Sequence, residues 1–412
     1  MEQDYTAKIK ALLGNLAAKI PRTLISFEKL EYINNEIVDR LEVDDMILLR
    51  SFFNSLLHYM RKVEASDIDI GGYGTRGMVW FRVHGKKKPV PGLGGFDTDE
   101  LDILIQTLLM KSQREHLIEH KNLDFSYVFK NSEGETFRNR ADVYIDLDSI
   151  ALNMRAINTQ IRPYSNYDFH EEVTRIFSLE HTKEGLILIT GITGSGKSTT
   201  LDPIVDMNNQ TVEGHIVIIA SPIEFVHTSK KCIVRHREVG RDTESFKQGT
   251  VEALRQDPDI IVIGEMRDPD TIMRALEAAD SGHKVISTLH TSSAVESIDR
   301  IIGEVRANDQ DRVRNRLADV LKCVISQKLI PGIGGKRVMA KEIMVMTPPI
   351  RSTIKNENTS EIYQLINEGQ KYGMFTVEQD LKLLYEKRSI TLENAFNYAN
   401  NKRRIQQLIH SK

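Results

Sequence analysis

The chain has 412 residues, which is long enough for two or three domains that each bury a core of their own. With 40% hydrophobic and 27% charged residues, its composition is that of an ordinary soluble globular protein. A formal net charge of −3 excludes a general electrostatic attraction of the whole protein to nucleic acid or to an anionic membrane.

The two cysteines, Cys232 and Cys323, form neither a Cys-x-x-Cys pair nor a disulfide framework, which indicates a reducing compartment and no structural zinc site. The N-terminus lacks the charged-then-apolar pattern of a signal peptide. No apolar run approaches the roughly 20 residues that cross a bilayer. We therefore expect a cytoplasmic protein with no membrane span, whose contact with a membrane runs through partners.

The first part of the chain predicts a helical N-terminal extension over residues 1–64, because apolar residues recur there at spacings close to the helical period. From Ala65 the pattern changes to short alternating strands and turns, which predict a small α+β domain over residues 65–160. Within it, residues 101–118 predict a single helix.

The second part predicts an α/β fold. Residues 158–167, with Pro163, are typical of a linker. Apolar strands then alternate with helical stretches over residues 168–340, an order that predicts βαβ units and a parallel sheet. The expected strands are 186–190, 215–220, 259–264 and 283–289. Residues 341–412 are predicted to form a helical C-terminal region.

Residues 191–198 read Gly-Ile-Thr-Gly-Ser-Gly-Lys-Ser, a complete G-x-x-x-x-G-K-[ST] phosphate loop between a predicted strand and a predicted helix. Such a turn points backbone N–H groups and the positive end of the helix dipole at a phosphate. Lys197 can reach the β/γ oxygens of ATP, and the Ser198 hydroxyl is the expected Mg²⁺ ligand. The alternative is a glycine-rich surface turn, which seldom occurs in such a strand–loop–helix context. The residues expected to bind the nucleotide here are Gly191, Thr193, Gly194, Ser195, Gly196, Lys197, Ser198 and Thr199.

Hydrolysis requires more than a phosphate loop, and two acids follow neighbouring strands. Glu265 ends the apolar strand 259–264 and can hold Mg²⁺; the alternative is an exposed acid that only ends a core strand. Glu224 follows the strand 215–220, where it can activate the attacking water. His290 follows a further strand, where a neutral imidazole can bond a γ-phosphate, although a histidine at a strand end is more often structural.

An ordered set of segments carries a resemblance to a known family. Besides the phosphate loop, they are Ser-Pro-Ile-Glu-Phe-Val-His at 221–227, Arg-Glu-Val-Gly-Arg-Asp-Thr at 237–243, Gly-Glu-Met-Arg-Asp at 264–268, and the histidine-containing stretch 282–292. The chain resembles the secretion ATPases of type II and type IV pilus systems, and within them the twitching-motility pilus-retraction ATPase family. The resemblance is dense from about residue 181 to 386 and thinner from 65 to 180, and residues 1 to about 60 stay unassigned.

The resemblance implies a homo-hexameric ring of subunits in which a PAS-like domain precedes a RecA-like ATPase domain, with ATP and Mg²⁺ bound between them. It implies that Glu224 is the catalytic glutamate and that Glu265 is the Walker B acid. His283 and His290 would form a histidine box that contacts the nucleotide.

Family members also bring arginines of the N-terminal domain to the phosphates. Arg138, Arg140 and Arg155 occupy the similar strands, and Arg155 is the best match. Cationic groups aimed at the γ-phosphate would stabilise the charge that develops there. The alternative is that these arginines are surface residues of a sheet.

Three departures from the family pattern affect this interpretation. Ala220-Ser221 replaces a Glu-Asp pair near the expected Mg²⁺ site, and Pro203 falls inside the helix that follows the phosphate loop, which it is expected to kink or shorten. Residues 352–356 match the retraction motif only loosely, although Pro349-Ile350-Arg351 stands where that motif begins.

The leading interpretation is a hexameric, Mg²⁺-dependent ATPase that drives pilus retraction at the cytoplasmic face of the inner membrane, with an inner-membrane platform protein as partner. The alternative is the ATPase of a type IV secretion or conjugation system. A nucleic-acid motor is disfavoured by the net charge and by the lack of an aromatic-basic stripe. A nucleotide switch that does not hydrolyse ATP stays open because of Ala220-Ser221.

Overall fold

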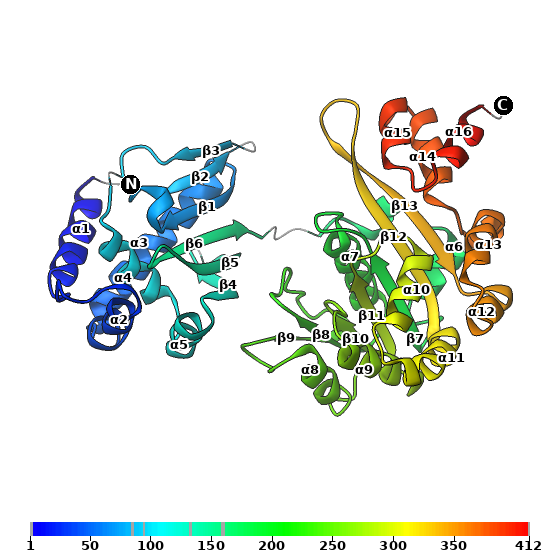
Figure 1. The fold of residues 1–412 in the computed structure, drawn as a ribbon, viewed down its shortest axis with the longest axis horizontal. Coiled ribbons are helices and arrows are strands. Elements are labelled where there is room, and N and C mark those ends of the chain that lie inside the picture. The colour runs from blue at the N-terminus through cyan, green and yellow to red at the C-terminus, as the bar shows by residue number, and fades with distance from the viewer. Residues whose placement is uncertain (1–2, 84–85, 94, 132–133, 158–160, 411–412) are drawn as a thin grey trace. The chain divides into compact units, whose positions relative to one another are not determined.

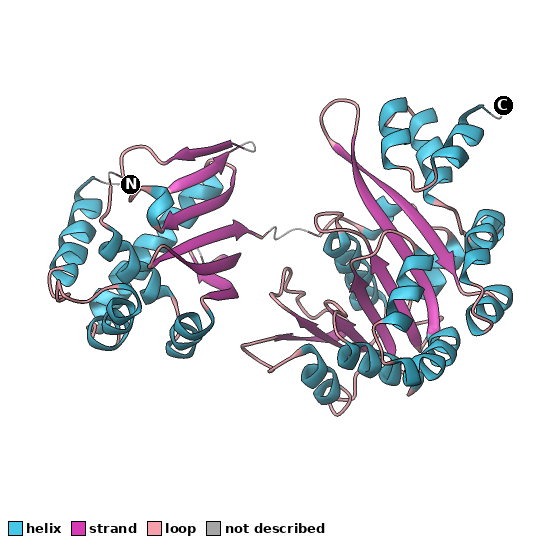
Figure 2. Ribbon diagram, in the orientation of Figure 1, coloured by secondary structure: helices cyan, strands magenta, loops and turns pink. Residues whose placement is uncertain are grey.

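The computed structural model describes residues 3–83, 86–93, 95–131, 134–157 and 161–410. The chain divides into two compact units, Met1–Thr159 and Gln160–Lys412, and each contains its own β-sheet (Figures 1 and 2). Residues 158–160 of the predicted linker lie outside the described residues.

The first unit contains a six-stranded antiparallel sheet with the strand order β3-β2-β1-β6-β5-β4. Its strands are β1 (Ala65–Gly71), β2 (Trp80–Val83), β3 (Lys86–Pro89), β4 (Asn122–Lys130), β5 (Thr136–Asp146) and β6 (Ser149–Ala156). Its helices are α1 (Gln3–Ala17), α2 (Ser26–Tyr32), α3 (Val43–Lys62), α4 (Thr98–Leu108) and α5 (Lys111–His120), with a π-helical segment at Ile33–Val38.

The N-terminal helices share one apolar core with this sheet. Leu13 of α1, Phe52 of α3 and Ile68 of β1 are all fully buried in the same cluster. The helices before residue 64 and the sheet therefore belong to one compact unit, and the predicted division at residue 64 does not separate two bodies. The apolar stripe of the helices and the apolar face of the sheet each need the other to be removed from water.

The predicted helix 101–118 forms as two helices, α4 and α5. Leu109 and Met110 are extended, with ψ of 147° and 158°, so the helical backbone stops between them. The backbone N–H of Met110 donates to Gln113 Oε1 at 2.9 Å, which caps the start of α5.

The opposite face of the first sheet is polar, because successive strand residues point to opposite sides. Ile68 and Val143 face the core, whereas their strand neighbours Asp67 and Asp142 belong to the polar face. A row of charged residues crosses strands β2, β1, β6 and β5 in register on this face: Arg82, Asp67, Arg155 and Arg140.

The second unit has an α/β fold, as the sequence predicts. Its seven-stranded sheet has the order β13-β12-β7-β11-β10-β8-β9, and every neighbouring pair is parallel except β12 and β13. Its strands are β7 (Gly185–Thr190), β8 (Gly214–Ala220), β9 (Cys232–Glu238), β10 (Ile260–Ile263), β11 (Lys284–Leu289), β12 (Leu321–Pro331) and β13 (Arg337–Val345). Strands β7, β10 and β11 are buried at every position, as expected for a parallel sheet whose two faces are covered.

The helices of the second unit cover this sheet and extend beyond it (Figure 1). They are α6 (Glu171–Phe177), α7 (Lys197–Thr211), α8 (Phe246–Ala253), α9 (Pro269–Asp280), α10 (Ala294–Gly303), α11 (Gln310–Val320), α12 (Pro348–Lys355), α13 (Ile362–Glu368), α14 (Val377–Glu386), α15 (Leu392–Tyr398) and α16 (Lys402–His410). Among the residues that the structure describes, no helix of either unit is long and apolar enough to cross a membrane.

Strands β9, β12 and β13 were not predicted. Strand β9 lies at the edge of the sheet and mixes exposed with buried positions, so it contains no apolar run. Strand β13 crosses the predicted boundary between residues 340 and 341, because it pairs with β12 from Cys323↔Val345 to Pro331↔Arg337. The helical C-terminal region therefore begins at Pro348 rather than at residue 341.

Candidate nucleotide site

The phosphate-loop segment joins the buried strand β7 to helix α7 in the second unit. Gly191 begins this turn with φ of +150°, and a Cβ atom there would lie 2.3 Å from Ser195 Oγ and 2.5 Å from the carbonyl oxygen of Gln327. Only glycine allows this close approach of the backbone. The loop is therefore tightly closed around its own backbone.

The N-terminus of α7 presents uncapped N–H groups. Its N-cap residue is Gly196, with φ of +89°, and no side chain caps the helix. Uncapped N–H groups and the positive end of the helix dipole form an anion site. The hydroxyl oxygen of Ser195 is also buried without a hydrogen-bond partner among the described residues. These features fit a phosphate group in the loop.

The side chain of Lys197 folds back over the loop. Its Nζ donates to the carbonyl oxygens of Gly191 at 2.8 Å and Ile192 at 3.3 Å. Burial lowers the pKa of Lys197, and the negative charges of Glu265 and Glu224 oppose this shift. Both predicted acids therefore lie near the ammonium group.

Glu265 follows strand β10 and has two basic neighbours. Its Oε2 lies 2.7 Å from Arg267 Nε and 3.7 Å from His290 Nε2. Burial lowers the pKa of His290 from its ordinary value of 6.5, Lys197 adds to this effect, and Glu265 opposes it. The ring is therefore uncharged at neutral pH and can hydrogen-bond a phosphate oxygen.

Strand order explains why these residues gather. Strands β7, β11, β10 and β8 are neighbours in that order and all run parallel, so their carboxyl ends meet at one edge of the sheet. The phosphate loop, His290, Glu265 and Glu224 follow these four strands in turn. The structure thus brings together the four main elements of the predicted site.

Glu224 is exposed in the loop after β8, and this loop is tied to helix α7. His227 Nε2 lies 3.2 Å from Asp202 Oδ1 on α7. Burial raises the pKa of Asp202, His227 opposes this shift, and Glu224 adds to it. The helix that follows the phosphate loop and the loop that carries Glu224 are therefore held together.

Strand β12 supports the phosphate loop through Gln327, a contact that was not predicted. Gln327 Nε2 donates to the carbonyl oxygen of Ser195 at 3.0 Å, and Gln327 Oε1 accepts from Thr200 Oγ1 at 2.9 Å. The side chain is buried, and β12 lies beside β7 in the sheet. The dense part of the family resemblance, from about residue 181 to 386, covers this strand, but nothing in it singled out Gln327.

His283 does not join this cluster. It precedes strand β11, and its neighbour Lys284 lies opposite Gly185 at the start of β7, whereas the phosphate loop follows the end of β7. A six-residue strand spans roughly 20 Å, so His283 lies at the opposite edge of the sheet. Its Nδ1 lies 3.2 Å from the carbonyl oxygen of Ala278 and 3.1 Å from Ser281 Oγ. The structure therefore contradicts the prediction that His283 contacts the nucleotide bound to its own subunit.

The three predicted arginines lie on the polar face of the first sheet. Arg140 and Arg155 are opposite each other on β5 and β6, and Arg138 precedes Arg140 by two positions, on the same face. Arg155 Nε lies 2.8 Å from Asp67 Oδ1, and Arg140 Nε lies 3.6 Å from Asp124 Oδ1. The structure groups the arginines, and their contact with phosphate stays a prediction.

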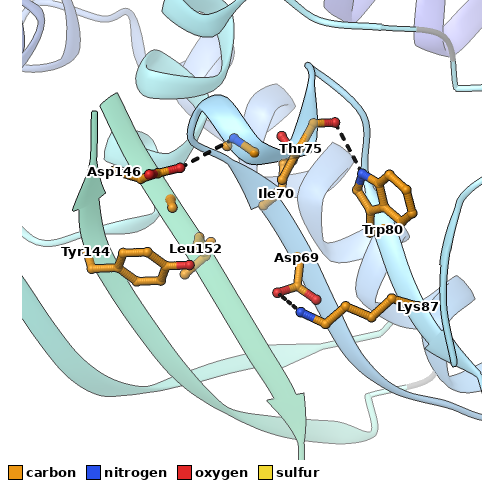
Figure 3. Close-up of a pocket in the computed structure, with 11 residues that line it drawn as sticks. Asp69, Ile70, Thr75, Trp80, Lys87, Tyr144, Asp146 and Leu152 are labelled. Carbon is orange, nitrogen blue, oxygen red and sulfur yellow. Dashed lines mark hydrogen bonds and ion pairs between the residues drawn. The ribbon is translucent and has the colours of Figure 1, made fainter. Parts of the chain in front are cut away.

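A separate cavity of about 320 Å³ lies on the same sheet of the first unit (Figure 3). The residues that line it include Asp69, Trp80, Tyr144 and Asp146. Lys87 also lines it and forms an ion pair with Asp69, with 2.8 Å between Lys87 Nζ and Asp69 Oδ1. Burial raises the pKa of Tyr144, and Asp69 and Asp146 add to this shift. The negative potential of this cavity disfavours a phosphate group, which separates it from the nucleotide site.

Comparison with known proteins assigns the family. Residues 149–337 match the family model described as Type II/IV secretion system protein. The chain is 39% identical over 340 residues to the type IV pilus retraction ATPase PilT of Pseudomonas aeruginosa, across 82% of this chain and 96% of that protein. It is 35% identical over 328 residues to a twitching motility protein of Neisseria gonorrhoeae, across 78% of this chain and 84% of that protein.

Solved structures give the same result. The crystal structure of the pilus retraction motor PilT with bound ADP matches with a TM-score of 0.76 at 35% identity, across 85% of this chain and 98% of that chain. The ATPase DotB of Legionella pneumophila matches with a TM-score of 0.67 at 26% identity, across 84% of this chain and 94% of that chain. The chain belongs to the type II/IV secretion ATPase family. Its predicted resemblance to the twitching-motility retraction ATPases is confirmed by the similarity to PilT over most of both chains.

Proposed function

We propose that this protein is a Mg²⁺-dependent ATPase that assembles as a homo-hexamer and powers type IV pilus retraction at the cytoplasmic face of the inner membrane. The observation that carries the proposal is the gathering of Lys197, Glu265, Glu224 and His290 at one edge of a parallel sheet. Similarity to PilT along 96% of that protein's length supports the choice of retraction. In this proposal the second unit is RecA-like and the sheet of the first unit is PAS-like.

The phosphates of ATP lie against the N–H groups of α7 and the ammonium group of Lys197. Glu224 accepts a proton from the water that attacks the γ-phosphorus, while the bond between that phosphorus and the β–γ bridging oxygen breaks to release ADP. Neutral His290 donates a hydrogen bond to a γ-phosphate oxygen and loses this partner when phosphate leaves.

Ser198 and Glu265 would hold Mg²⁺. A hydroxyl in the first turn of α7 and a carboxylate after β10, at the same edge of the sheet, are hard oxygen ligands of the kind that Mg²⁺ prefers. The ion supplies positive charge to the β- and γ-phosphates. Arg155, Arg140 and Arg138 are proposed to add positive charge when the domains close in the ring.

The enzymatic part of the proposal is tested by phosphate release from purified protein, with Mg²⁺ and with EDTA. Lys197→Ala should abolish binding or turnover, because the phosphates lose their lysine, whereas the exposed Lys183→Ala should retain wild-type turnover. Light scattering should detect a species near six subunits. Unchanged hydrolysis in Lys197→Ala would refute the site, and full activity in a strictly monomeric protein would refute the ring.

A secretion ATPase is the second candidate, favoured by the loose match of residues 352–356 to the retraction motif and by the name of the matching family. Substitution of Arg351, which is exposed on α12, tests whether the ATPase drives pilus retraction or secretion. For retraction, Arg351→Ala should hydrolyse ATP within a few-fold of wild type, while cells accumulate surplus pili. The control is Arg403→Ala, which removes an exposed arginine outside this segment. Normal pilus numbers with failed export of a substrate would favour secretion.

A further inference from the structure

Helix α7 contains a proline at a position where the regular hydrogen bonding of an α-helix requires a backbone N–H donor. Pro203 lies inside the helix, which nevertheless continues to Thr211. Proline has no N–H, so Pro203 cannot bond the carbonyl oxygen of Thr199, and its ring crowds that carbonyl. Thr199 directly follows Ser198, the expected Mg²⁺ ligand, so the gap falls in the first turn after the phosphate loop.

Tyr167 fills this gap from outside the helix. Its hydroxyl donates a hydrogen bond to the carbonyl oxygen of Thr199. Tyr167 ends a 3₁₀ turn, Tyr164–Tyr167, in the segment that leads from the first unit into the second. The residue is only 8% exposed.

Aromatic contacts fix the ring of Tyr167 from behind. It stacks on Phe169 with centroids 5.8 Å apart and an interplanar angle of 8°. Phe169 in turn meets the fully buried Phe177 edge-on, at 5.2 Å and 84°. Tyr164 Oη lies 2.9 Å from Thr174 Oγ1, which ties the start of the turn to helix α6. The core of the second unit therefore sets the position of the Tyr167 hydroxyl.

The hydroxyl also stays a donor across the physiological pH range. Burial raises the pKa of Tyr167 above its ordinary value of 10.0, Arg162 opposes this shift, and Asp202 adds to it. The phenol is therefore protonated wherever the site is expected to work.

From these contacts we propose that Tyr167 is a positioning residue for the nucleotide site, which completes the first turn of α7 and so orients Ser198 and the N–H groups before Pro203. The proposal rests on the proposed function, because it takes the N-terminus of α7 as the phosphate site. Tyr167 belongs to the segment that connects the two units along the chain.

A double-mutant cycle tests the proposal. Tyr167→Phe keeps the ring but removes the donor, and should weaken Mg²⁺-ADP binding about 2- to 10-fold, the range expected for one hydrogen bond. Pro203→Ala restores a helix N–H for Thr199, so adding Tyr167→Phe to it should leave the affinity unchanged. Tyr363→Phe is the matched control, because it removes a tyrosine hydroxyl of the second unit that donates to Glu378 Oε2 on α14, at 3.0 Å, rather than to α7.

Two measurements separate the possible outcomes. Calorimetry gives the dissociation constant for ADP, and hydrogen exchange of the nucleotide-free protein should show faster exchange in the first turn of α7 for Tyr167→Phe alone. If the wild-type protein binds no ADP, the proposed function fails and this proposal fails with it. Two results would refute only the positioning role in a protein that does bind ADP. In the first, Tyr167→Phe binds ADP as tightly as the wild type. In the second, Tyr167→Phe weakens ADP binding by the same factor in the wild-type and Pro203→Ala backgrounds.

Discussion

The sheets of the two units bury their side chains in different ways. In the antiparallel sheet of the first unit, burial alternates, so that Phe129 on β4 is buried while its neighbour Val128 is 38% exposed. In the parallel part of the second sheet, strand β10 is buried at every position from Ile260 to Ile263. The difference decides where functional groups can lie. An open antiparallel sheet offers a whole polar face, whereas a covered parallel sheet offers only the ends of its strands.

The charged residues of the two units follow this rule. The first unit spreads Arg82, Asp67, Arg155 and Arg140 across a face of its sheet. The second unit concentrates its acids and His290 where parallel strands end. We therefore expect substitutions at the strand ends of the second unit to have the largest effects on turnover.

The largest expected effect is at Glu224. Glu224→Gln keeps the shape of the side chain but removes the base, so ATP should still bind while turnover falls by about 10²–10⁴. Glu265→Gln should weaken the Mg²⁺ dependence as well as the rate. The exposed Glu244→Gln in the same unit is the control for loss of a surface carboxylate. Steady-state hydrolysis checks the series, and normal turnover in Glu224→Gln would exclude Glu224 as the base.

The next effect concerns stability and tests the burial pattern itself. In the parallel sheet, Ile260→Ala and Ile261→Ala should each lower the free energy of unfolding by about 2–5 kcal/mol, although the residues are adjacent. In the antiparallel sheet, Phe129→Ala should lower it by about 3–5 kcal/mol and Val128→Ala by no more than about 0.5 kcal/mol.

Urea unfolding measures both series. Fluorescence of Trp80, the only tryptophan of the chain, reports the first unit, and circular dichroism follows both units. A large effect at only one of Ile260 and Ile261 would contradict the contrast between the two sheets.

The smallest expected effect is at the other edge of the parallel sheet, where Lys284 is fully buried. Its Nζ donates to the carbonyl oxygens of Ile176 at 2.5 Å and Ser178 at 3.3 Å. Burial lowers the pKa of Lys284 from 10.5 to about 7, and the charges of Lys322 and Lys183 add to the shift. At this edge the buried lysine contacts the backbone of the segment before β7.

The sign of the pH dependence follows from this shift. Between pH 7 and 10.5 the unfolded chain holds more protons on Lys284 than the folded chain does. The free energy of unfolding should therefore rise with pH in this window, by at most about 1.4 kcal/mol per pH unit, and this contribution is lost as the pH falls toward 7. Denaturation between pH 7 and 9 should show the slope, Lys284→Leu should remove it, and the exposed Lys336→Leu should keep it. An unchanged slope in Lys284→Leu would assign the effect to other groups.

The sequence predicted strands β7, β8, β10 and β11 because each is a local apolar run, and it predicted the phosphate loop because its pattern is local too. It did not predict the outer strands β9, β12 and β13. It did not predict the contact of Gln327 with Ser195, which joins positions 132 residues apart. The family resemblance grouped His283 with His290, but the two residues flank opposite ends of β11. The division at residue 64 was expected because the local period changes there, whereas the core that joins the helices to the sheet is a tertiary property.

Two charges beside the phosphate loop already have partners inside the chain. Lys197 is held by two loop carbonyl oxygens, and Glu265 is held by Arg267. In the proposed site, nucleotide entry would therefore exchange these partners: phosphate oxygens would replace the carbonyl oxygens at Lys197, and Glu265 would exchange Arg267 for Mg²⁺. A phosphate that arrives without its cation meets the negative charge of Glu265, and a cation that arrives alone meets the positive charge of Lys197. A site of this kind would consequently bind the metal–nucleotide complex in preference to either component alone.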